Sequence, residues 1–189
     1  DKNASSLAVG GTSKGVSTLQ MAAAYATFGN GGKYYDPYCY YKVTNSSGTM
    51  VYLQHDETDG DQIMSQDTAD IMNELLQTVV TDTAGGATSN YGLNNMKLFA
   101  KTGTTTEDKD RWFCGGSPYY VAAVWYGCDT PKQLSNYVSG NPAGKIFDEV
   151  MNRVNKGLAS KDFTKFSSIV EQKEYCTKTG LLAGSGWSE

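Results

Sequence analysis

The run Lys101-Thr102-Gly103-Thr104-Thr105 constrains the fold most, because it directly follows the largely apolar residues 96–100. Side chains of an extended segment alternate between two faces, so Lys101 and Gly103 share one face. Thr102 and Thr104 share the other. A glycine within a strand often marks a close approach by a ligand or another backbone. Such an edge can pair with a peptide-like substrate, hold a carboxylate through hydroxyls and offer a backbone N–H to a developing oxyanion.

The composition is that of an ordinary folded domain, or a large part of one. The chain has 189 residues, of which 39% are hydrophobic and 19% are charged. A net charge of −4, with both signs interspersed, argues against a nucleic-acid partner. No apolar run is long enough to cross a bilayer, and we find no signal peptide. Because the chain begins at Asp1 without an initiator methionine, we expect it to be a segment of a longer protein.

The four cysteines predict neither a metal site nor a cofactor. They include no C-x-x-C pair, and no histidine lies near enough in sequence for a zinc site. In an extracytoplasmic protein they could form disulfides in three connectivities. The favoured interpretation is that they are small buried side chains that stay reduced. These cysteines are Cys39, Cys114, Cys128 and Cys176.

The first third of the chain predicts a helix and then a hairpin. Ser17 to Gln20 has the capping-box pattern, and apolar residues follow at helical spacing until the glycines of residues 29–32. Residues 33–43, with five tyrosines, are predicted to form a strand. After a turn at residues 45–48, residues 49–53 return as its partner. Residues 54–62 are predicted to be a polar loop.

The rest of the chain predicts two long helices around three strands. Ser65 caps the first helix, whose apolar stripe is Ile71, Met72, Leu75, Leu76, Val79 and Val80. A linker over residues 82–95 precedes predicted strands at 97–105, 111–115 and 119–127. Asn141 caps the second helix with Pro142 at its first position, and Gly157 ends it. Its apolar face is Ile146, Phe147, Val150, Met151 and Val154.

This order predicts an α+β fold, an antiparallel sheet flanked by helices. We predict one unit over residues 1–157 and an irregular tail over 158–189, with a short strand-like run at 168–170. A second triplet, Lys178-Thr179-Gly180, lies in that tail without a sheet pattern after it. We interpret the second triplet as a chance repeat.

The first triplet resembles the third active-site motif of penicillin-binding proteins and serine β-lactamases, whose set is S-x-x-K, S-x-N or S-D-N, and K-T-G. Residues 7–11 and 15–32 resemble the glycine loop and helix of their transpeptidase domains. Residues 79–81 resemble the stretch before the third motif. Residues 110–115 and 121–127 resemble the two strands that follow it. The Thr-Thr ending and the D-x-W-F-x-G strand resemble class A, the bifunctional glycosyltransferase–transpeptidases. The resemblance covers about residues 5–157 and implies a β-lactamase/transpeptidase-like fold.

Two members of that motif set have no counterpart in the expected place. The chain contains no Ser-x-x-Lys, whose serine is the acylated nucleophile in this family. Its Ser-x-Asn, Ser139-Gly140-Asn141, follows Lys101 although the family places this motif before the third, and we interpret it as the helix cap. The chain therefore resembles the C-terminal half of a transpeptidase domain, and the missing N-terminal half is its expected partner.

The resemblance implies a role for each residue of the first triplet. Lys101 would polarise the serine of the missing second motif and support proton transfer. Thr102 and Thr104 would hold the carboxylate of a β-lactam or of a peptidoglycan stem peptide. The backbone N–H of Thr104 would complete the oxyanion hole, and Gly103 would let the ligand approach. Alternation puts the threonines and Lys101 on opposite faces, which strand twist must reconcile. Trp112 and Phe113 are interpreted as core or cleft-lining side chains, with core favoured.

Other constellations are weaker. His55 is the only histidine and is interpreted as a solvated loop residue rather than the base of a Ser-His-Asp triad. The acidic run around His55 does not fit a calcium loop, because positions that require carboxylates hold His55 and Gln66. Glu107, Asp108 and Asp110 could form an acid and base pair, but we interpret them as solubilising charges in an exposed turn.

The resemblance implies a serine D-Ala-D-Ala transpeptidase that forms peptidoglycan cross-links through an acyl-serine intermediate. The isolated chain is predicted to be inactive. Alternatives are a serine β-lactamase, a D-Ala-D-Ala carboxypeptidase, or a noncatalytic wall-binding or sensor module. Class A relatives sit on the extracytoplasmic face of the bacterial cell membrane, so we expect a membrane-anchored parent protein there.

Overall fold

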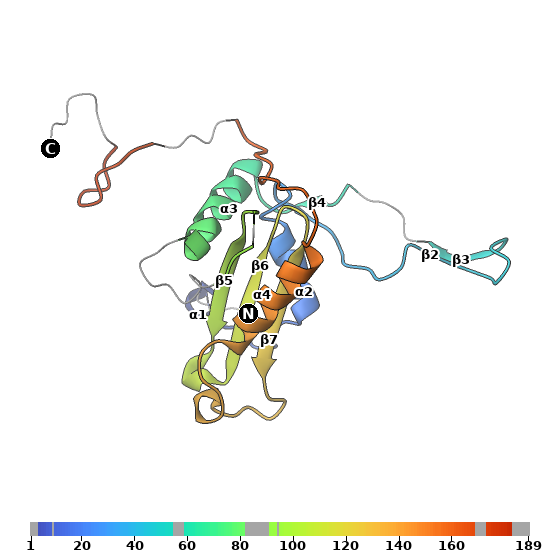
Figure 1. Ribbon diagram of the computed structural model, residues 1–189, viewed down its shortest axis with the longest axis horizontal. Helices are drawn as coiled ribbons and strands as arrows, with labels where there is room; N and C mark the ends of the chain where they lie inside the picture. Colours follow the sequence, from blue (N-terminus) through green and yellow to red (C-terminus); the bar gives the residue numbers. More distant parts are fainter. Residues whose placement is uncertain are drawn as a thin grey trace.

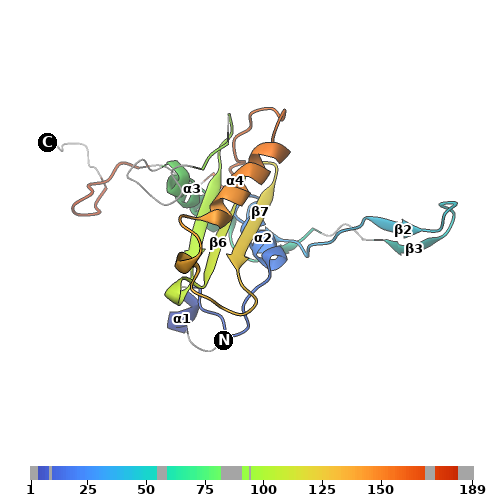
Figure 2. The ribbon, with the colours of Figure 1, turned by 60° about the horizontal axis from the view of Figure 1, so that its bottom comes forward.

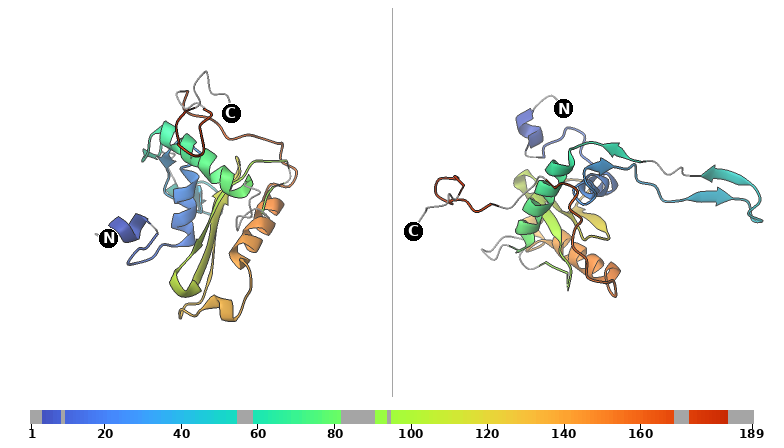
Figure 3. Two further views of the ribbon diagram at one scale, coloured as in Figure 1. Left: turned by 90° about the vertical axis from the view of Figure 1, so that its left-hand side faces the viewer. Right: turned by 90° about the horizontal axis from the view of Figure 1, so that it is seen from above.

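The computed structural model describes residues 4–8, 10–54, 59–81, 91–93, 95–168 and 173–182. Its body has three layers (Figures 1 and 3). Helices α2 (Thr18–Ala26) and α3 (Gln66–Thr81) lie on one side of a three-stranded sheet, and α4 (Pro142–Val154) lies on the other. The predicted α+β arrangement is confirmed. A short helix, α1 (Ala4–Ala8), precedes these layers.

The sheet is antiparallel in the order β5–β6–β7. Its strands are β5 (Phe99–Thr104), β6 (Asp110–Gly116) and β7 (Val121–Gly127), close to the three predicted ranges. A short 3-10 turn, η1 (Thr106–Asp108), joins β5 to β6, and another, η2 (Leu134–Asn136), lies between β7 and α4. Because β5 is an outer strand, its far edge pairs with no other strand of the described residues. The K-T-G run thus lies at the edge of the sheet.

The main core lies between the sheet and α4. Phe113 of β6 and Phe147 of α4 are fully buried, and their ring centroids are 4.7 Å apart. Gly144 lets α4 approach closely, because a Cβ there would lie 2.8 Å from the Tyr91 ring. The buried members of this core are Leu98, Ala100, Phe113, Ala143, Phe147 and Met151.

Capping explains where the helices begin. Ser17 and Gln20 form the predicted capping box of α2, in which each side chain bonds the other's backbone N–H. The Ser65 hydroxyl accepts the Thr68 N–H at the start of α3. Asn141 Oδ1 accepts the Gly144 N–H at the start of α4, whose first residue is Pro142. These three predicted caps are confirmed.

The tyrosine-rich segment differs from the prediction. Residues 33–43 do not form one strand: β1 (Lys33–Tyr34) pairs with β4 (Asp61–Gln62), inside the predicted polar loop. Only β2 (Lys42–Thr44) pairs with β3 (Val51–Gln54), and this hairpin projects far from the body (Figure 1). All its strand residues are exposed, so no packed face enforces a long regular strand there.

The buried face of α3 differs from the predicted apolar stripe. Ile71 and Leu75 are exposed by 46% and 55%, whereas the polar residues Asp70 and Asn73 are buried. Asn73 Nδ2 donates to the Phe28 carbonyl, which ties α3 to the end of α2. Asp70 accepts two backbone N–H groups from the C-terminal part of the chain. Polar side chains can face inward here because the backbone supplies their hydrogen-bond partners.

Residues 158–168, the C-terminal strap, contain no helix or strand but contact the body at several points. Asp70 Oδ2 accepts the Phe166 and Ser167 N–H groups at 2.9 and 2.8 Å. The Phe163 ring packs 5.4 Å from the Phe99 ring, and Ser160 donates to the Asn95 carbonyl. The predicted boundary after residue 157 stays a prediction. Most of the predicted linker 82–95 and two residues of the predicted run 168–170 lie outside the described residues.

Candidate active site

A cavity of about 800 Å³ lies between the glycine-rich segment before α2, α2 itself and one face of the sheet. Gly10, Gly11 and Gly15 line its rim, and Met21 and Tyr25 face it from α2. On the sheet side it is lined by Lys101, Thr102, Gly103, Thr104, Thr105, Asp110, Trp112, Cys114 and Trp125. The whole predicted triplet therefore borders one cavity.

The register of β5 on β6 assigns side chains to faces. Lys101 pairs with Cys114 and Gly103 with Trp112, so all four share the cavity face. Thr102 pairs with Phe113 and so belongs to the opposite face, as alternation predicts. Thr102 and Thr104 nevertheless line the cavity, because β5 is the outer strand and both of its faces reach the rim. Lys101 is exposed, and its Nζ donates to the Thr102 carbonyl at 3.1 Å.

The floor of the cavity is aromatic and apolar. Trp112 is half-buried and lines the cavity, so the favoured interpretation of this side chain as core is wrong, whereas Phe113 is core. Burial raises the pKa of the Cys114 thiol to about 12 and that of the Tyr25 hydroxyl to about 12. Both groups are therefore neutral at physiological pH, and the charged side chains that line this cavity are those of Lys101 and Asp110.

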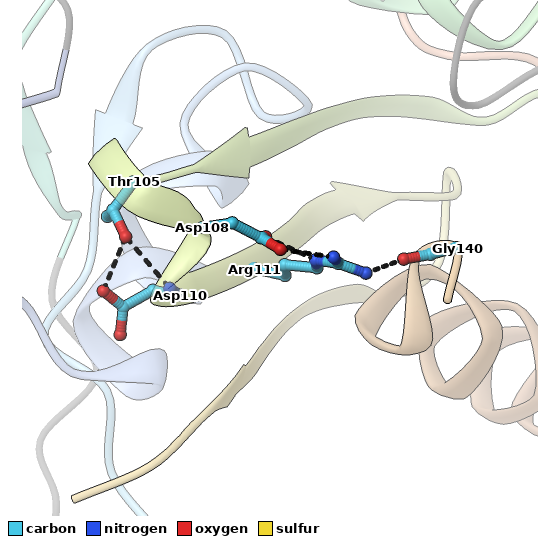
Figure 4. Close-up of polar contacts among 5 residues, drawn as sticks. All are labelled: Thr105, Asp108, Asp110, Arg111 and Gly140. Atoms are coloured by element: carbon cyan, nitrogen blue, oxygen red, sulfur yellow. Dashed lines mark hydrogen bonds and ion pairs between the residues drawn. The ribbon is translucent and has the colours of Figure 1, made fainter. Parts of the chain in front are cut away.

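The turn between β5 and β6 holds a polar network that the sequence interpretation missed (Figure 4). The Thr105 hydroxyl donates to Asp110 Oδ2 at 2.8 Å, and Asp108 receives two hydrogen bonds from the Arg111 guanidinium. Arg111 also donates to the Gly140 carbonyl. The side chains of Asp108 and Arg111 are only 20% and 12% exposed. Asp108 and Asp110 are therefore structural partners and not free solubilising charges, while Glu107 is exposed beside Lys109.

The Arg111 guanidinium holds the pKa of the Asp108 carboxyl below its usual value, chiefly through hydrogen bonds. Glu107 and Asp108 have left-handed φ angles of 60° and 53°, which cost energy for residues other than glycine. The D-x-W spacing could have indicated part of this network, because it places Asp110 and Trp112 on one strand face. The partners of Asp110 come from other segments and leave no local signal: Thr105 lies just after β5, and Trp125 of β7 donates its Nε1–H to Asp110 Oδ1.

Neither the second triplet nor the Ser-x-Asn lines this cavity. The second triplet forms a turn, in which the Gly180 N–H donates to the Cys176 carbonyl. Asn141 of the Ser-x-Asn caps α4, as predicted. His55 lies outside the described residues. All four cysteines are free thiols, but only Cys114 is buried. Cys39 is exposed and Cys128 and Cys176 are half-buried, so the interpretation as buried side chains is wrong for these three.

Neither a metal site nor a membrane-spanning helix is found among the described residues. They contain no group of three or more His, Cys, Asp or Glu side chains placed to hold a metal ion. None of their helices is long and apolar enough to cross a membrane.

Residues 1–152 match the family model for the penicillin binding protein transpeptidase domain. The chain belongs to this family. Among its curated relatives is penicillin-binding protein 1A of Clostridium acetobutylicum, 40% identical over 152 residues that cover 80% of this chain and 18% of the relative. Penicillin-binding protein 1F of Bacillus subtilis is 33% identical over 172 residues, 87% of this chain and 23% of the relative. The transpeptidase segment thus spans about a fifth of the length of these relatives.

Solved structures of penicillin-binding proteins share the fold. Penicillin-binding protein 1A from Haemophilus influenzae superposes with a TM-score of 0.77 and 22% identity, over 96% of this chain and 32% of that one. The D,D-transpeptidase domain of a peptidoglycan glycosyltransferase from Eggerthella lenta gives a TM-score of 0.58 at 22% identity, over 76% of this chain and 33% of that one. The predicted family and the β-lactamase/transpeptidase-like fold are confirmed.

Proposed function

We propose that this chain is the C-terminal portion of a serine D,D-transpeptidase domain that cross-links peptidoglycan stem peptides and is acylated by β-lactams. The observation that carries the proposal is the open cavity beside β5, in which an ammonium, a glycine and two threonines border one rim. The chain contains no Ser-x-x-Lys, so an upstream segment supplies the nucleophile. We further propose that the longer protein is anchored at the extracytoplasmic face of the cell membrane.

The roles of the triplet follow from its chemistry. The Lys101 ammonium attracts the substrate carboxylate and polarises the hydroxyl of the second motif, which relays a proton. The Thr102 and Thr104 hydroxyls hydrogen-bond the terminal carboxylate of the donor peptide. Gly103 leaves the strand edge open, so that the peptide can pair with the β5 backbone.

The reaction itself is an acyl transfer in two steps. The upstream serine oxygen bonds to the penultimate D-alanine carbonyl carbon, its proton passes to the leaving amine, and the terminal D-alanine departs. The amine of a second stem peptide then attacks the ester, loses a proton, and returns the serine hydroxyl. In both steps the Thr104 N–H stabilises the tetrahedral oxyanion, an interaction generally worth about 3–4 kcal/mol in acyl-transfer enzymes.

An unpartnered apolar stripe on α4 supports the upstream half as a partner. Ile146, Val150 and Val154 are spaced four residues apart and exposed by 46%, 43% and 46%. Asp148 and Asn152 of α4 bond to Gly92, so the stripe lies on the opposite flank of the helix. Figure 2 shows α4 running across the sheet beside β7, whose outer edge pairs with no other described strand. Most of the length of the relatives lies outside this segment, and we propose that part of it covers the stripe.

The test is covalent labelling by a fluorescent penicillin in the full-length protein. Lys101→Ala should lower the labelling rate by at least about 100-fold, because it removes the ammonium of the site. Lys178→Ala is the matched control, since it alters the second triplet, and it should label normally. The isolated 189-residue chain should acquire no covalent adduct by mass spectrometry.

Normal labelling of Lys101→Ala would refute the assigned role. Binding of muropeptides without any acylation of the full-length protein would instead support the sensor-module alternative. Rapid hydrolysis of the penicillin adduct would support a β-lactamase.

A further inference from the structure

Three hydrogen bonds tie the end of β5 to the start of β6. The Thr105 hydroxyl donates to Asp110 Oδ2 at 2.8 Å and accepts the Asp110 backbone N–H at 2.9 Å (Figure 4). The Thr105 N–H donates to the Asp110 carbonyl at 3.1 Å. Thr105 directly follows Thr104, so this closed set of bonds fixes the backbone one residue beyond the proposed oxyanion donor.

The second carboxylate oxygen of Asp110 holds an aromatic side chain of the cavity floor. Trp125 Nε1 donates to Asp110 Oδ1 at 2.9 Å. Gly127 pairs with Asp110 across the sheet and makes this contact possible, because a Cβ there would lie 2.3 Å from Trp125 Cζ2. Thr105, Asp110 and Trp125 all line the cavity. One carboxylate therefore connects the rim strand, the second strand and the floor.

The turn between these strands needs such support. Glu107 and Asp108 both adopt left-handed φ angles, a conformation that persists only when surrounding contacts impose it. Arg111 holds the far side of the turn through Asp108 and the Gly140 carbonyl. Asp110 and Thr105 hold the side that faces the cavity. Without them, the end of β5 has no side-chain anchor between Thr104 and the strained residues.

We propose that Asp110 is a positioning residue for acyl transfer. Through Thr105 it fixes the direction of the Thr104 N–H, and through Trp125 it fixes the floor on which the acyl donor lies. The inference rests on the proposed function, because it assigns the Thr104 N–H to the oxyanion. An oxyanion donor must lie within a few tenths of an ångström of its target, and a misplacement of 1 Å can cost about 100-fold in rate. Loss of the anchor should therefore slow acylation more than it weakens initial binding.

The experiment measures acylation of the full-length protein by a fluorescent penicillin. Stopped-flow traces over a range of concentrations separate the dissociation constant of the noncovalent complex from the acylation rate constant. Asp110→Asn and Thr105→Val should each lower the rate constant about 10- to 100-fold, with less than about a threefold change in the dissociation constant. Asp110 and Thr105 act through the same hydrogen bonds, so the acylation rate constant of the double variant should lie within about twofold of that of the slower single variant.

Three further variants make the test specific. Thr105→Ser keeps the hydroxyl and should restore the rate to within about threefold of the parent. Gly127→Ala displaces the indole without altering the carboxylate and should slow acylation in the same manner. Glu107 is an exposed acid of the same turn, and Glu107→Gln should leave the acylation rate constant within about twofold of the parent value. The fraction of protein that labels at long times counts folded sites, so a variant that merely folds poorly lowers that fraction and not the rate constant.

The outcomes separate this inference from the proposed function. If the parent protein labels and Lys101→Ala does not, but folded Asp110→Asn and Thr105→Val acylate at the parent rate, the positioning role is wrong. Losses that multiply in the double variant would equally overturn it, because the two residues would then act independently. If the parent protein does not label, or Lys101→Ala labels normally, the proposed function fails and this inference fails with it.

Discussion

The buried carboxylate of Asp70 offers the sharpest test of the fold. It is 8% exposed, and its Oδ2 accepts the backbone N–H groups of Phe166 and Ser167. Glu74 lies one helical turn further along α3 and contacts the same C-terminal strap, through Lys165 at 3.3 Å. The two carboxylates thus bind the same segment in different surroundings, which makes Glu74 a matched control for Asp70.

The structure gives the size of the expected effect. A hydrogen bond to a charged acceptor contributes about 1.5–3 kcal/mol net, and Asp70 accepts two. Both bonds share one oxygen, and the 37% exposure of Phe166 lets water reach the strap, so we take about half of the sum. Asp70→Ala should therefore lower the free energy of unfolding by about 1.5–3 kcal/mol. In a chain of this size that loss corresponds to roughly 3–12 °C in Tm.

Glu74→Ala removes an ion pair whose side chains are 40% and 63% exposed, so it should cost about 0–1 kcal/mol. Urea unfolding of the parent chain and both variants measures the two effects. Limited trypsin digestion supplies a second measure. The side chains of Lys161 and Lys165 are already exposed, but release of the strap would free the backbone around them to enter the protease, so cleavage should speed up in Asp70→Ala alone. Equal losses in the two variants, or a loss below about 0.5 kcal/mol in Asp70→Ala, would refute the reasoning.

Three further predictions concern pH, thiol chemistry and the α4 stripe. The pKa of Asp108 is lowered in the folded chain, so its contribution to stability is present above about pH 4 and is lost as the pH falls through the folded-state value. The free energy of unfolding of Asp108→Asn should therefore depend less on pH in this acid range than that of the parent chain. An unchanged pH profile would contradict the lowered pKa of Asp108. At pH 8 iodoacetamide should modify Cys176 before Cys114. Hydrogen bonds from Thr179 lower the pKa of the Cys176 thiol. The Cys114 thiol has a pKa of about 12, so only about one in ten thousand is ionised at pH 8. Peptide mapping gives the order, and early labelling of Cys114 would show that the cavity floor is open. Val150 is 43% exposed in this chain, and we propose that it is covered in the full-length protein. Val150→Glu should therefore change the stability of the isolated chain by less than about 0.5 kcal/mol but destabilise the full-length protein by about 2 kcal/mol. Equal effects would contradict the proposed cover of α4.

Short-range sequence patterns predicted the helix starts and the central strands well. The helix caps at Ser17, Ser65 and Asn141 depend on hydrogen bonds within three residues, so the sequence contains both partners. The three central strands were predicted close to their observed ranges, because residues 97–127 contain short, largely apolar runs that are separated by clear turns. The triplet at residues 101–103 could likewise be assigned to an extended segment from the apolar residues before it, and its place at a cleft followed from the resemblance to the third motif.

Where the prediction failed, a distant contact decided the outcome. Residues 33–43 have the composition of a strand, but most of this run finds no partner strand, so β-propensity alone does not extend the pairing. The apolar stripe of α3 was too broad because Asp70 and Asn73 receive partners from the strap and from Phe28. Trp112 lines the cavity because its register with Gly103 places it on that face.

The order of the residues by itself determined the capped helices and the three strands, which depend on neighbours in the chain, and the family, which depends on the order of several motifs. The tertiary structure alone decided that Asp110 joins Thr105 to Trp125, that α3 buries a carboxylate, and that the stripe of α4 is left uncovered. A hydrogen bond or a buried surface needs two partners, and for these features the second partner lies on another element, where no local pattern can indicate it.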